Sequence, residues 1–249
     1  LGQTLIKRHN LKKEDIFHID DIFHKNKKKI YSQNYEDGII EIIFSIIKPK
    51  YKFYVEFGGA DGIWLSNTAN LRINHNWKGL LLEGDKDKIN PNNDINLKNE
   101  FITKENINNI FKKYNVPHDF DFLSIDIDSH DFYVWKNLEY RPIIVIIEVN
   151  TGIKNKFPLV IDDNNFTYDD IKEGYFGANI HAFYKLAVEK GYKLLTMESH
   201  NAFFVVNEKF KQFNIKEISL ENCINNYNKI GSWAWNIKSN KKWKKYNTK

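Results

Sequence analysis

Two stretches of the chain each run from an apolar segment into an acidic residue and then into a turn. Residues 53–62 read FYVEFGGADG, and residues 78–85 read KGLLLEGD. Short apolar runs bounded by glycine and charged residues predict buried strands, and the glycines predict a tight turn after the first one. The βαβ units that bind nucleotides have the same order: a strand, a glycine-rich turn, a helix and a second strand that ends in an acid. We therefore expect an α/β fold with a parallel sheet.

The charges around the glycine turn, residues 58–62, favour one kind of cofactor. Glu56, Asp61 and Glu83 surround the turn with negative charge, which disfavours a pyrophosphate. Glu83 follows Gly59 at roughly the 20-residue spacing at which a strand-end acid binds ribose hydroxyls. S-adenosylmethionine carries both a ribose and a cationic sulfonium. The dinucleotide pattern G-x-G-x-x-G is absent, so NAD and FAD are disfavoured, and a glycine-rich turn in an unrelated parallel sheet is the alternative.

Length and composition suit a single large domain. The chain has 249 residues, of which 42% are hydrophobic and 15% are aromatic. Such a chain can build one large core, but hardly two. We expect a helical and basic segment at residues 1–30, a main domain at residues 31–237 and a basic tail at residues 238–249. Because the first residue is Leu1, a further domain upstream is left open.

The chain has a single cysteine, Cys223, which excludes an internal disulfide and a cysteine-rich zinc site. No segment reaches the roughly 20 apolar residues of a membrane span, and the first residues lack the apolar core of a signal peptide. We therefore expect a cytoplasmic protein without a membrane span.

The net charge of +5 raises the question of a nucleic-acid partner. The excess lysines are concentrated at residues 25–29 and 238–249, and we interpret both runs as solvated, the second as a frayed tail. We therefore expect no nucleic-acid partner.

Apolar periodicities alternate along the chain as a doubly wound sheet requires. Strands are expected at residues 54–57, 79–83, 101–103, 121–126 and 143–148, and helices at residues 37–47, 67–74, 105–114, 131–138 and 179–190. Two further strands, residues 193–197 and 202–206, form an antiparallel pair after the last helix. This ending is typical of class I methyltransferases, so we expect a Rossmann-like, mostly parallel sheet with a carboxyl-terminal antiparallel hairpin.

Five short motifs follow one another along the chain. They are YSQNYED at residues 31–37, VEFGGADGIWLSNT at 55–68, WKGLLLEGD at 77–85, LSIDIDSHDFYVWKNL at 123–138 and IIEVN at 146–150. Together they resemble the FkbM-type S-adenosylmethionine-dependent methyltransferases over roughly residues 30–206. The resemblance implies methyl transfer to a hydroxyl, often on a sugar. The family commonly has Gly-Asn where this chain has Ser129 and His130, which points to a different substrate or a different base.

The resemblance also implies which residues meet the cofactor. The residues that we expect there are Gln33, Glu36, Asp37, Glu56, Gly58, Gly59, Asp61, Asn67, Glu83 and Asp126. The first three would close over the cofactor, Glu56 and Gly58 would face its methionine part, and Glu83 its ribose. Asn67 and Thr68 would order the turn, although residues of these types also cap helices.

Acidic and polar side chains follow the strands at residues 121–126 and 143–148, and open α/β sheets bind their ligands at such carboxyl ends. The group consists of Asp126, Asp128, His130, Glu148 and Asn150. A neutral hydroxyl attacks poorly until its proton is withdrawn. Either His130 or Asp128 is the general base, or Asp126, Asp128, Glu148 and Asn150 hold Mg²⁺ or Mn²⁺, which prefer oxygen ligands. Asp131 is expected to cap the next helix.

Other residues are assigned by their position. We expect His200, in the turn between the last two strands, to reach the substrate or to be merely exposed, and His181 to be structural or a substrate contact. The long connection, residues 151–176, is expected to form a lid over the acceptor. Trp233 and Trp235 cover either the sheet or the seam of a homodimer.

The sequence thus predicts a cytoplasmic O-methyltransferase (EC 2.1.1) acting on a carbohydrate hydroxyl. The acceptor would be a nucleotide-activated or carrier-linked sugar for capsule or surface polysaccharide biosynthesis, and the basic charge suits a phosphorylated molecule. A methyltransferase of a small non-sugar or phosphorylated metabolite, a non-catalytic cofactor-binding module and an NAD-dependent sugar enzyme are the alternatives.

Overall fold

The computed structural model describes residues 23, 25–89, 95–215, 217–229 and 236–247. Most of the helical and basic segment expected at residues 1–30, together with Trp233 and Trp235, lies outside these residues.

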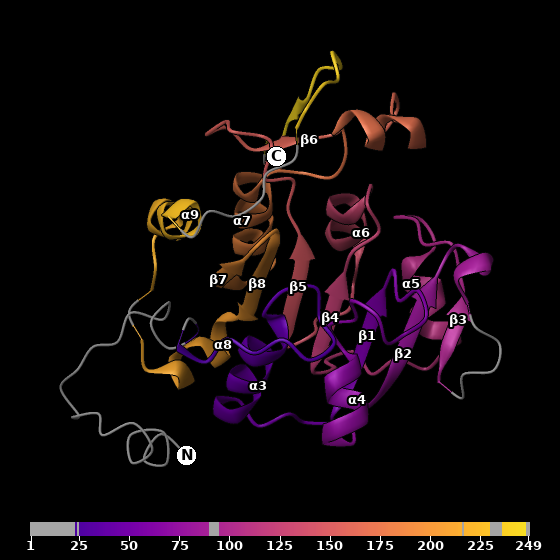
Figure 1. The fold of residues 1–249 in the computed structure, drawn as a ribbon, viewed down its shortest axis with the longest axis vertical. Coiled ribbons are helices and arrows are strands. Elements are labelled where there is room, and N and C mark those ends of the chain that lie inside the picture. Colours follow the sequence, from indigo (N-terminus) through magenta and orange to yellow (C-terminus); the bar gives the residue numbers. More distant parts are fainter. Residues whose placement is uncertain (1–22, 24, 90–94, 216, 230–235, 248–249) are drawn as a thin grey trace.

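The centre of the fold is a seven-stranded sheet with the strand order β3-β2-β1-β4-β5-β8-β7 (Figure 1). Its strands are β1 (Phe53–Phe57), β2 (Lys78–Glu83), β3 (Leu97–Asn99), β4 (Phe122–Ile125), β5 (Ile144–Glu148), β7 (Tyr192–Glu198) and β8 (Asn201–Val206). The five strands from β3 to β5 pair in parallel, and β8 is antiparallel to both of its neighbours. One reversed strand within an otherwise parallel sheet is the Rossmann-like arrangement of class I methyltransferases. The predicted fold class is confirmed.

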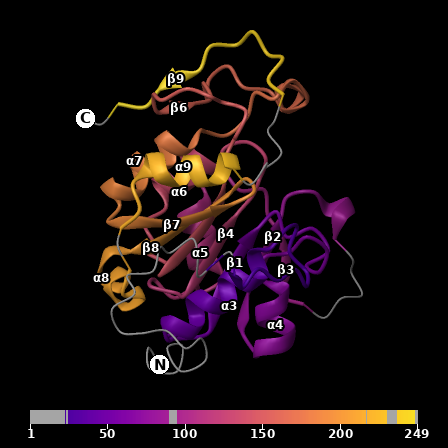
Figure 2. The ribbon, with the colours of Figure 1, turned by 60° about the vertical axis from the view of Figure 1, so that its left-hand side comes forward.

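Helices cover both faces of this sheet (Figures 1 and 2). They are α3 (Glu36–Ile46), α4 (Ala69–His75), α5 (Ile107–Lys113), α6 (Asp131–Asn137), α7 (Ile180–Glu189), α8 (Asn207–Phe210) and α9 (Leu220–Lys229), with short 3₁₀ turns η1 (Lys86–Lys88), η2 (Tyr168–Glu173) and η3 (Lys211–Phe213). Phe44 of α3 packs edge-on against Phe122 of β4, whereas Trp135 of α6 packs against Phe204 of β8. The strand registers place Phe204 on the same face as Leu123, opposite to Phe122. Helices α3 and α6 therefore lie on opposite faces.

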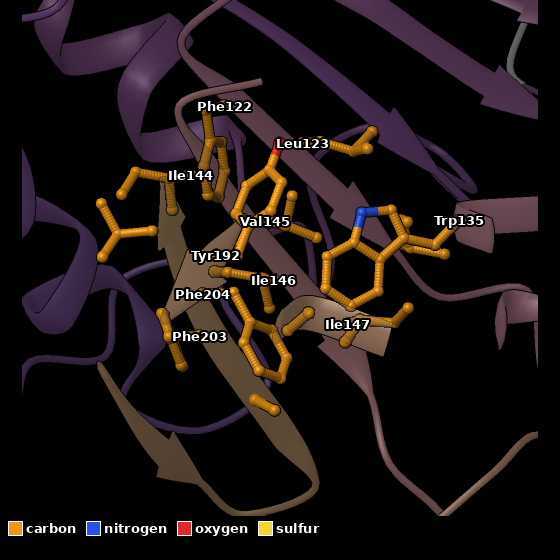
Figure 3. Packing of buried hydrophobic residues seen from close by; sticks show 14 of the residues in the cluster. Phe122, Leu123, Trp135, Ile144, Val145, Ile146, Ile147, Tyr192, Phe203 and Phe204 are labelled. Atoms are coloured by element: carbon orange, nitrogen blue, oxygen red, sulfur yellow. The ribbon is translucent and has the colours of Figure 1, made fainter. Parts of the chain in front are cut away.

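Buried hydrophobic side chains pack together around the middle strands of the sheet (Figure 3). Every residue of β5 is buried, as its continuous apolar sequence predicts for a strand covered on both faces. Trp135, Tyr192 and Phe204 gather on one of these faces, with Tyr192 edge-on to the indole ring. Burying one such side chain contributes about 1.5–3 kcal/mol, so this cluster stabilises the packing of α6 on the sheet.

The structure corrects two predicted elements. The third strand, β3, lies just before the expected residues 101–103, because Leu97 pairs with Leu81. Phe101 is instead 56% exposed and contacts the ring of Tyr168. The long connection is less irregular than expected, since it contains β6 (Leu159–Val160) and η2.

The basic carboxyl end is not a frayed tail in its described part, residues 236–247. Strand β9 (Lys244–Lys245) pairs antiparallel with β6, and Tyr246 is buried. Lys241 and Lys244 form ion pairs with aspartates of the long connection. The lysines that predicted a solvated run therefore fasten this end of the chain over the carboxyl ends of the strands.

Among the residues that the structure describes, no helix combines the length and the apolar character that a membrane crossing requires.

Candidate functional site

The glycine turn after β1 passes very close to the end of β4. Gly58 has a φ of 69°, and a Cβ at this position would lie 1.9 Å from the carbonyl oxygen of Asp126. Only glycine accommodates both the positive φ and this contact. The turn thus brings the backbone of β1 directly against the strand end that carries the predicted chemistry.

Glu83 ends β2 beside the same turn. One carboxylate oxygen accepts a hydrogen bond from the backbone N–H of Ala60 (3.0 Å), and the other accepts one from Asp85 (2.8 Å). The side chain is only 6% exposed, so the two bonds hold it in one orientation. Each oxygen retains a second lone pair for a ligand hydroxyl.

Glu56 is tied to the start of α4. Its carboxylate accepts hydrogen bonds from the Ser66 hydroxyl and the Asn67 N–H, each at 2.7 Å, and from the Thr68 hydroxyl. The side-chain amide of Asn67 in turn donates to Ser124 of β4. Burial raises the pKa of Glu56, although these three donors oppose that shift. The geometry therefore gives Glu56 and Asn67 an ordering role behind the turn, and their contact with a cofactor stays a prediction.

The loop after the glycine turn is held by Asp61. Its carboxylate accepts the backbone N–H groups of Ile63 (2.9 Å) and Trp64 (2.8 Å). This local turn leaves the ring of Trp64 72% exposed. Asp61 thus shapes the loop, and its predicted contact with a cofactor is not required for this role.

The segment before α3, residues 30–37, is organised by Asp37. This residue is fully buried, and its Oδ2 accepts the backbone N–H groups of Ile30, Tyr31 and Ser32 as well as the Ser32 hydroxyl. Ser32 also forms an isolated parallel bridge with Leu65. Asp37 therefore fixes the segment against the loop that follows the glycine turn.

The same segment is also joined to the turn between β7 and β8. Gln33 Oε1 lies 2.9 Å from Nε2 of His200, and the Glu36 carboxylate accepts the side-chain amide of Asn201 at 3.0 Å. Burial lowers the pKa of His200, and its Nδ1 lies 3.1 Å from the Ser199 hydroxyl. Both ring nitrogens of His200 thus have partners, which favours a positioning role over a free base.

Three carboxylates lie together at the ends of β4 and β5. Asp126, Asp128 and Glu148 each offer an oxygen within 4.8 Å of the others, and we call them the acid cluster. Asp128 has a positive φ of 56°, which non-glycine residues adopt rarely. Oε2 of Glu148 is buried and has no hydrogen-bond partner among the described residues. The structure thus brings these predicted residues together and leaves one oxygen open to a cation or a proton.

The acid cluster is electrostatically strained. Burial, followed by the Asp128 carboxylate, raises the pKa of Asp126 well above its usual value. Burial and then Asp126 do the same for Glu148, and burial also raises the pKa of Asp128. Close carboxylates disfavour simultaneous ionisation, so a shared proton or a bound cation would stabilise the group.

Two predicted residues face elsewhere. Nε2 of His130 lies 3.0 Å from the Asp163 carboxylate, and its ring meets Phe166 edge-on, so this histidine contacts the long connection. The amide of Asn150 donates to the carbonyls of Gly174 and Phe176, while its oxygen accepts the N–H of Gly152. Asn150 therefore holds the long connection in place, and its role as a metal ligand stays a prediction.

Asp131 stabilises the turn before α6 rather than capping the helix as expected. Its two carboxylate oxygens accept the backbone N–H groups of Ile127 (2.9 Å) and Ser129 (3.0 Å). The N-cap position is His130, whose side chain makes no capping bond. Burial raises the pKa of Asp131 to about 6.

A cavity of about 630 Å³ begins at the residue that follows Glu148. Its wall comes from the start of the long connection, the start of α7, the end of β7 and helix α9. Of the residues that line the cavity, only His181 and Asn150 were predicted from the sequence as candidates for a functional site. The four segments are far apart in the chain, and each contributes only a few apolar residues, so no local pattern reveals the cavity.

Comparison with known proteins yields similarity in fold alone. No family model matches the chain, and no curated protein matches it in sequence. An S-adenosylmethionine-dependent methyltransferase from Clostridium acetobutylicum ATCC 824 is 12% identical, with a TM-score of 0.43 over 76% of this chain and 96% of that one. An O-methyltransferase from Bacillus cereus in complex with SAH is 12% identical, with a TM-score of 0.38 over 82% and 94%. The N-terminal domain of EvdMO1 with SAH bound is 9% identical, with a TM-score of 0.40 over 78% and 97%.

Proposed function

We propose that this protein is an S-adenosylmethionine-dependent O-methyltransferase whose acceptor is a sugar hydroxyl. The observation that carries the proposal is the orientation of Glu83. Its carboxylate stands at the end of β2, is fixed by the N–H groups of Ala60 and Asp85, and lies beside the turn that Gly58 makes possible. An acid in this place binds the two hydroxyls of a ribose.

The residues around the turn also suit a positively charged cofactor. The acid cluster adjoins the turn through the contact between Gly58 and Asp126. Burial and then the neighbouring carboxylates raise the pKa values of Asp126 and Glu148, so a positive charge nearby would stabilise their ionised forms. When bound, S-adenosylmethionine supplies an electrophilic methyl group and a sulfonium charge. Gln33 and Glu36, on the segment fastened by Asp37, would hold the cofactor from the other side.

Methyl transfer requires that the acceptor lose a proton. The acceptor oxygen would take the place of sulfur on the methyl carbon, and a base of this chain would accept the hydroxyl proton. Asp128 is the preferred base, because it is the exposed member of the acid cluster and can meet an acceptor, and partial desolvation raises the pKa of its carboxylate. His130 is less suited because its ring contacts the long connection, and His200 because both of its ring nitrogens have partners.

A divalent cation is the second way to activate the hydroxyl. Asp126, Asp128 and Glu148 provide hard oxygen ligands at short mutual distances, and the open Oε2 of Glu148 lacks another partner in the described part of the chain. Mg²⁺ or Mn²⁺ held there would acidify a hydroxyl bound beside it. Asn150, which we expected among the ligands, would join them through the second lone pair of its oxygen, since the first accepts the Gly152 N–H.

The sugar acceptor rests on the FkbM resemblance, and the nucleotide-activated or carrier-linked form rests on the net charge of +5, which suits a phosphorylated molecule. A small phosphorylated metabolite is the competing acceptor. Incubation with labelled S-adenosylmethionine and a panel of sugars, sugar phosphates and nucleotide sugars distinguishes the two by the molecule that gains the methyl group.

Calorimetry tests the cofactor. We expect binding of S-adenosylhomocysteine and not of NAD, and Glu83→Gln is expected to weaken that binding about tenfold or more, since hydrogen bonds to a charged group contribute about 1.5–3 kcal/mol. Glu139→Gln, at an exposed site, is the matched control and should bind normally. Binding of NAD in preference to S-adenosylhomocysteine, or an unchanged affinity in a folded Glu83→Gln variant, would contradict the proposal.

A further inference from the structure

We infer that the cavity beside the acid cluster binds the non-reacting part of the acceptor, and that this part combines an apolar group with an anion. The inference rests on the proposed function where it calls the bound molecule the acceptor. Binding of such a molecule in the cavity does not depend on methyl transfer. It follows from three observations: the position of the cavity, its apolar wall and the lysines at its mouth.

The position of the cavity links it to the reaction. Val149, which follows Glu148 directly, lines the cavity, and its N–H donates to the carbonyl of His200 at 2.7 Å. Met197, near the end of β7, lines the cavity as well. A molecule in the cavity therefore lies next to the carboxyl ends of β5 and β7, at the same edge of the sheet as the acid cluster.

One part of the cavity wall is apolar, and the other lining residues are polar or charged. The apolar part is formed by Val149, Ile153, Ile180, Met197, Leu220 and Ile224. Four of these side chains are at least nine-tenths buried in the chain. A volume of about 630 Å³ lies within the range of small-molecule sites, roughly 300–1,000 Å³, and is larger than one sugar needs. The wall thus suits a hydrocarbon or aromatic group rather than a second polar sugar.

Positive charge dominates the mouth of the cavity. Lys154 and Lys156 are exposed there and form no ion pair with any residue that the structure describes, while Glu221 is the only acid in the lining. Nδ1 of His181 is buried without a hydrogen-bond partner in the same part of the chain. Two free lysines beside an apolar wall attract a phosphate or carboxylate that carries an apolar group.

Octyl phosphate is a suitable probe, and calorimetry measures its affinity for the full chain. We expect the binding of octyl phosphate to weaken as salt is added. Octanol lacks the anion and inorganic phosphate lacks the apolar group, so we expect each to bind about tenfold more weakly than octyl phosphate. Equal affinity for octanol and octyl phosphate would overturn the anionic part of the inference, and equal affinity for inorganic phosphate would overturn the apolar part.

Variants locate the probe. Lys154→Met with Lys156→Met should weaken octyl phosphate binding about tenfold, whereas Lys48→Met with Lys112→Met, two exposed lysines that do not line the cavity, should have little effect. Asn225→Trp, at the exposed rim on α9, should obstruct the mouth and reduce binding. Unchanged affinity in both cavity variants would overturn the inference.

Binding of S-adenosylhomocysteine separates this inference from the proposed function. If that compound binds and octyl phosphate does not, the cavity inference alone fails. If octyl phosphate binds as described and S-adenosylhomocysteine does not, the cavity binds molecules that carry both an anion and an apolar group, and the methyltransferase proposal fails. The cavity variants should leave S-adenosylhomocysteine binding unchanged.

Discussion

Nε2 of His200 and Oε1 of Gln33 lie 2.9 Å apart although 167 positions separate them in the chain. The contact joins the turn between β7 and β8 to the segment before α3. Because burial lowers the pKa of His200, the ring is neutral at neutral pH, and we assign Nε2 as the donor to Gln33 and Nδ1 as the acceptor from Ser199. The segment that would close over the cofactor is thus attached directly to the sheet.

Replacing Gln33 by leucine should loosen this attachment. The change removes the acceptor and leaves a buried imidazole N–H unpaired, which costs about 1–3 kcal/mol. We expect a lower melting temperature and weaker binding of S-adenosylhomocysteine, measured by calorimetry. Gln212→Leu, on the exposed turn η3, serves as the control and should leave both quantities unchanged. Normal binding by Gln33→Leu would exclude the segment from the cofactor site.

The raised pKa values in the acid cluster predict a pH-dependent stability. The folded pKa of Glu148 exceeds the unfolded value, so the folded state holds protons that the unfolded state has lost. Without divalent cations, stability should therefore fall as the pH rises from about 4–5 toward the raised pKa, by about 1.4 kcal/mol for each tenfold difference in proton affinity.

The variant Glu148→Gln tests the predicted fall in stability with rising pH. The variant should be more stable than the natural chain at pH 8, where the natural cluster must ionise, and should lose this advantage near pH 5. Melting temperatures in matched cation-free buffers give the comparison. A parallel pH dependence of the two proteins would show that Glu148 is not the group that binds the extra proton.

Much of the fold follows from local patterns, and the errors have physical causes. The continuous apolar run of β5 and the hairpin β7–β8 were predicted within a residue or two, because burial on both faces leaves few alternatives. β3 was misplaced because Phe101 is apolar and yet lies on the surface. The lysines near both ends were interpreted as solvated, but Lys27 forms an ion pair with buried Glu198 at 2.8 Å. The two residues are far apart in the chain, so no sequence pattern predicts this contact.

The candidate site was predicted only where strand ends supply its residues. Parallel strands end at one edge, so the proximity of Asp126, Asp128 and Glu148 follows from their positions in the chain. Sequence does not reveal which polar groups are already occupied by hydrogen bonds. Asp37 and Asn150 look like ligands in the sequence, yet Oδ2 of Asp37 accepts N–H groups of its own segment and the oxygen of Asn150 accepts that of Gly152. The other oxygen of Asp37, Oδ1, is buried and has no hydrogen-bond partner among the described residues.

Divalent cations should stabilise the protein through the acid cluster. Mg²⁺ or Mn²⁺ at about a hundred times its dissociation constant would add about 2.7 kcal/mol and raise the melting temperature. Asp128→Asn should abolish most of this rise, whereas Asp169→Asn, an exposed acid paired with Lys172, should retain it. An unchanged melting temperature with either ion, together with methyl transfer that survives chelation, would favour Asp128 as a metal-free base.

A matched pair of variants distinguishes the effect of the close contact between Gly58 and Asp126 on stability from the effect of backbone strain. Gly58 and Gly177 both have a positive φ, 69° and 60°, so alanine at either position costs about 1–2 kcal/mol of strain. A Cβ at Gly177 would find its nearest atom at 4.0 Å, whereas one at Gly58 would lie 1.9 Å from the Asp126 carbonyl oxygen. We therefore expect Gly58→Ala to reduce stability by at least about 2 kcal/mol more than Gly177→Ala, and to weaken S-adenosylhomocysteine binding by displacing the end of β4. Urea unfolding measures the first effect and calorimetry the second. Equal losses of stability in the two variants would mean that β1 and β4 do not approach as closely as this, and the geometry that joins the glycine turn to the acid cluster would then be wrong.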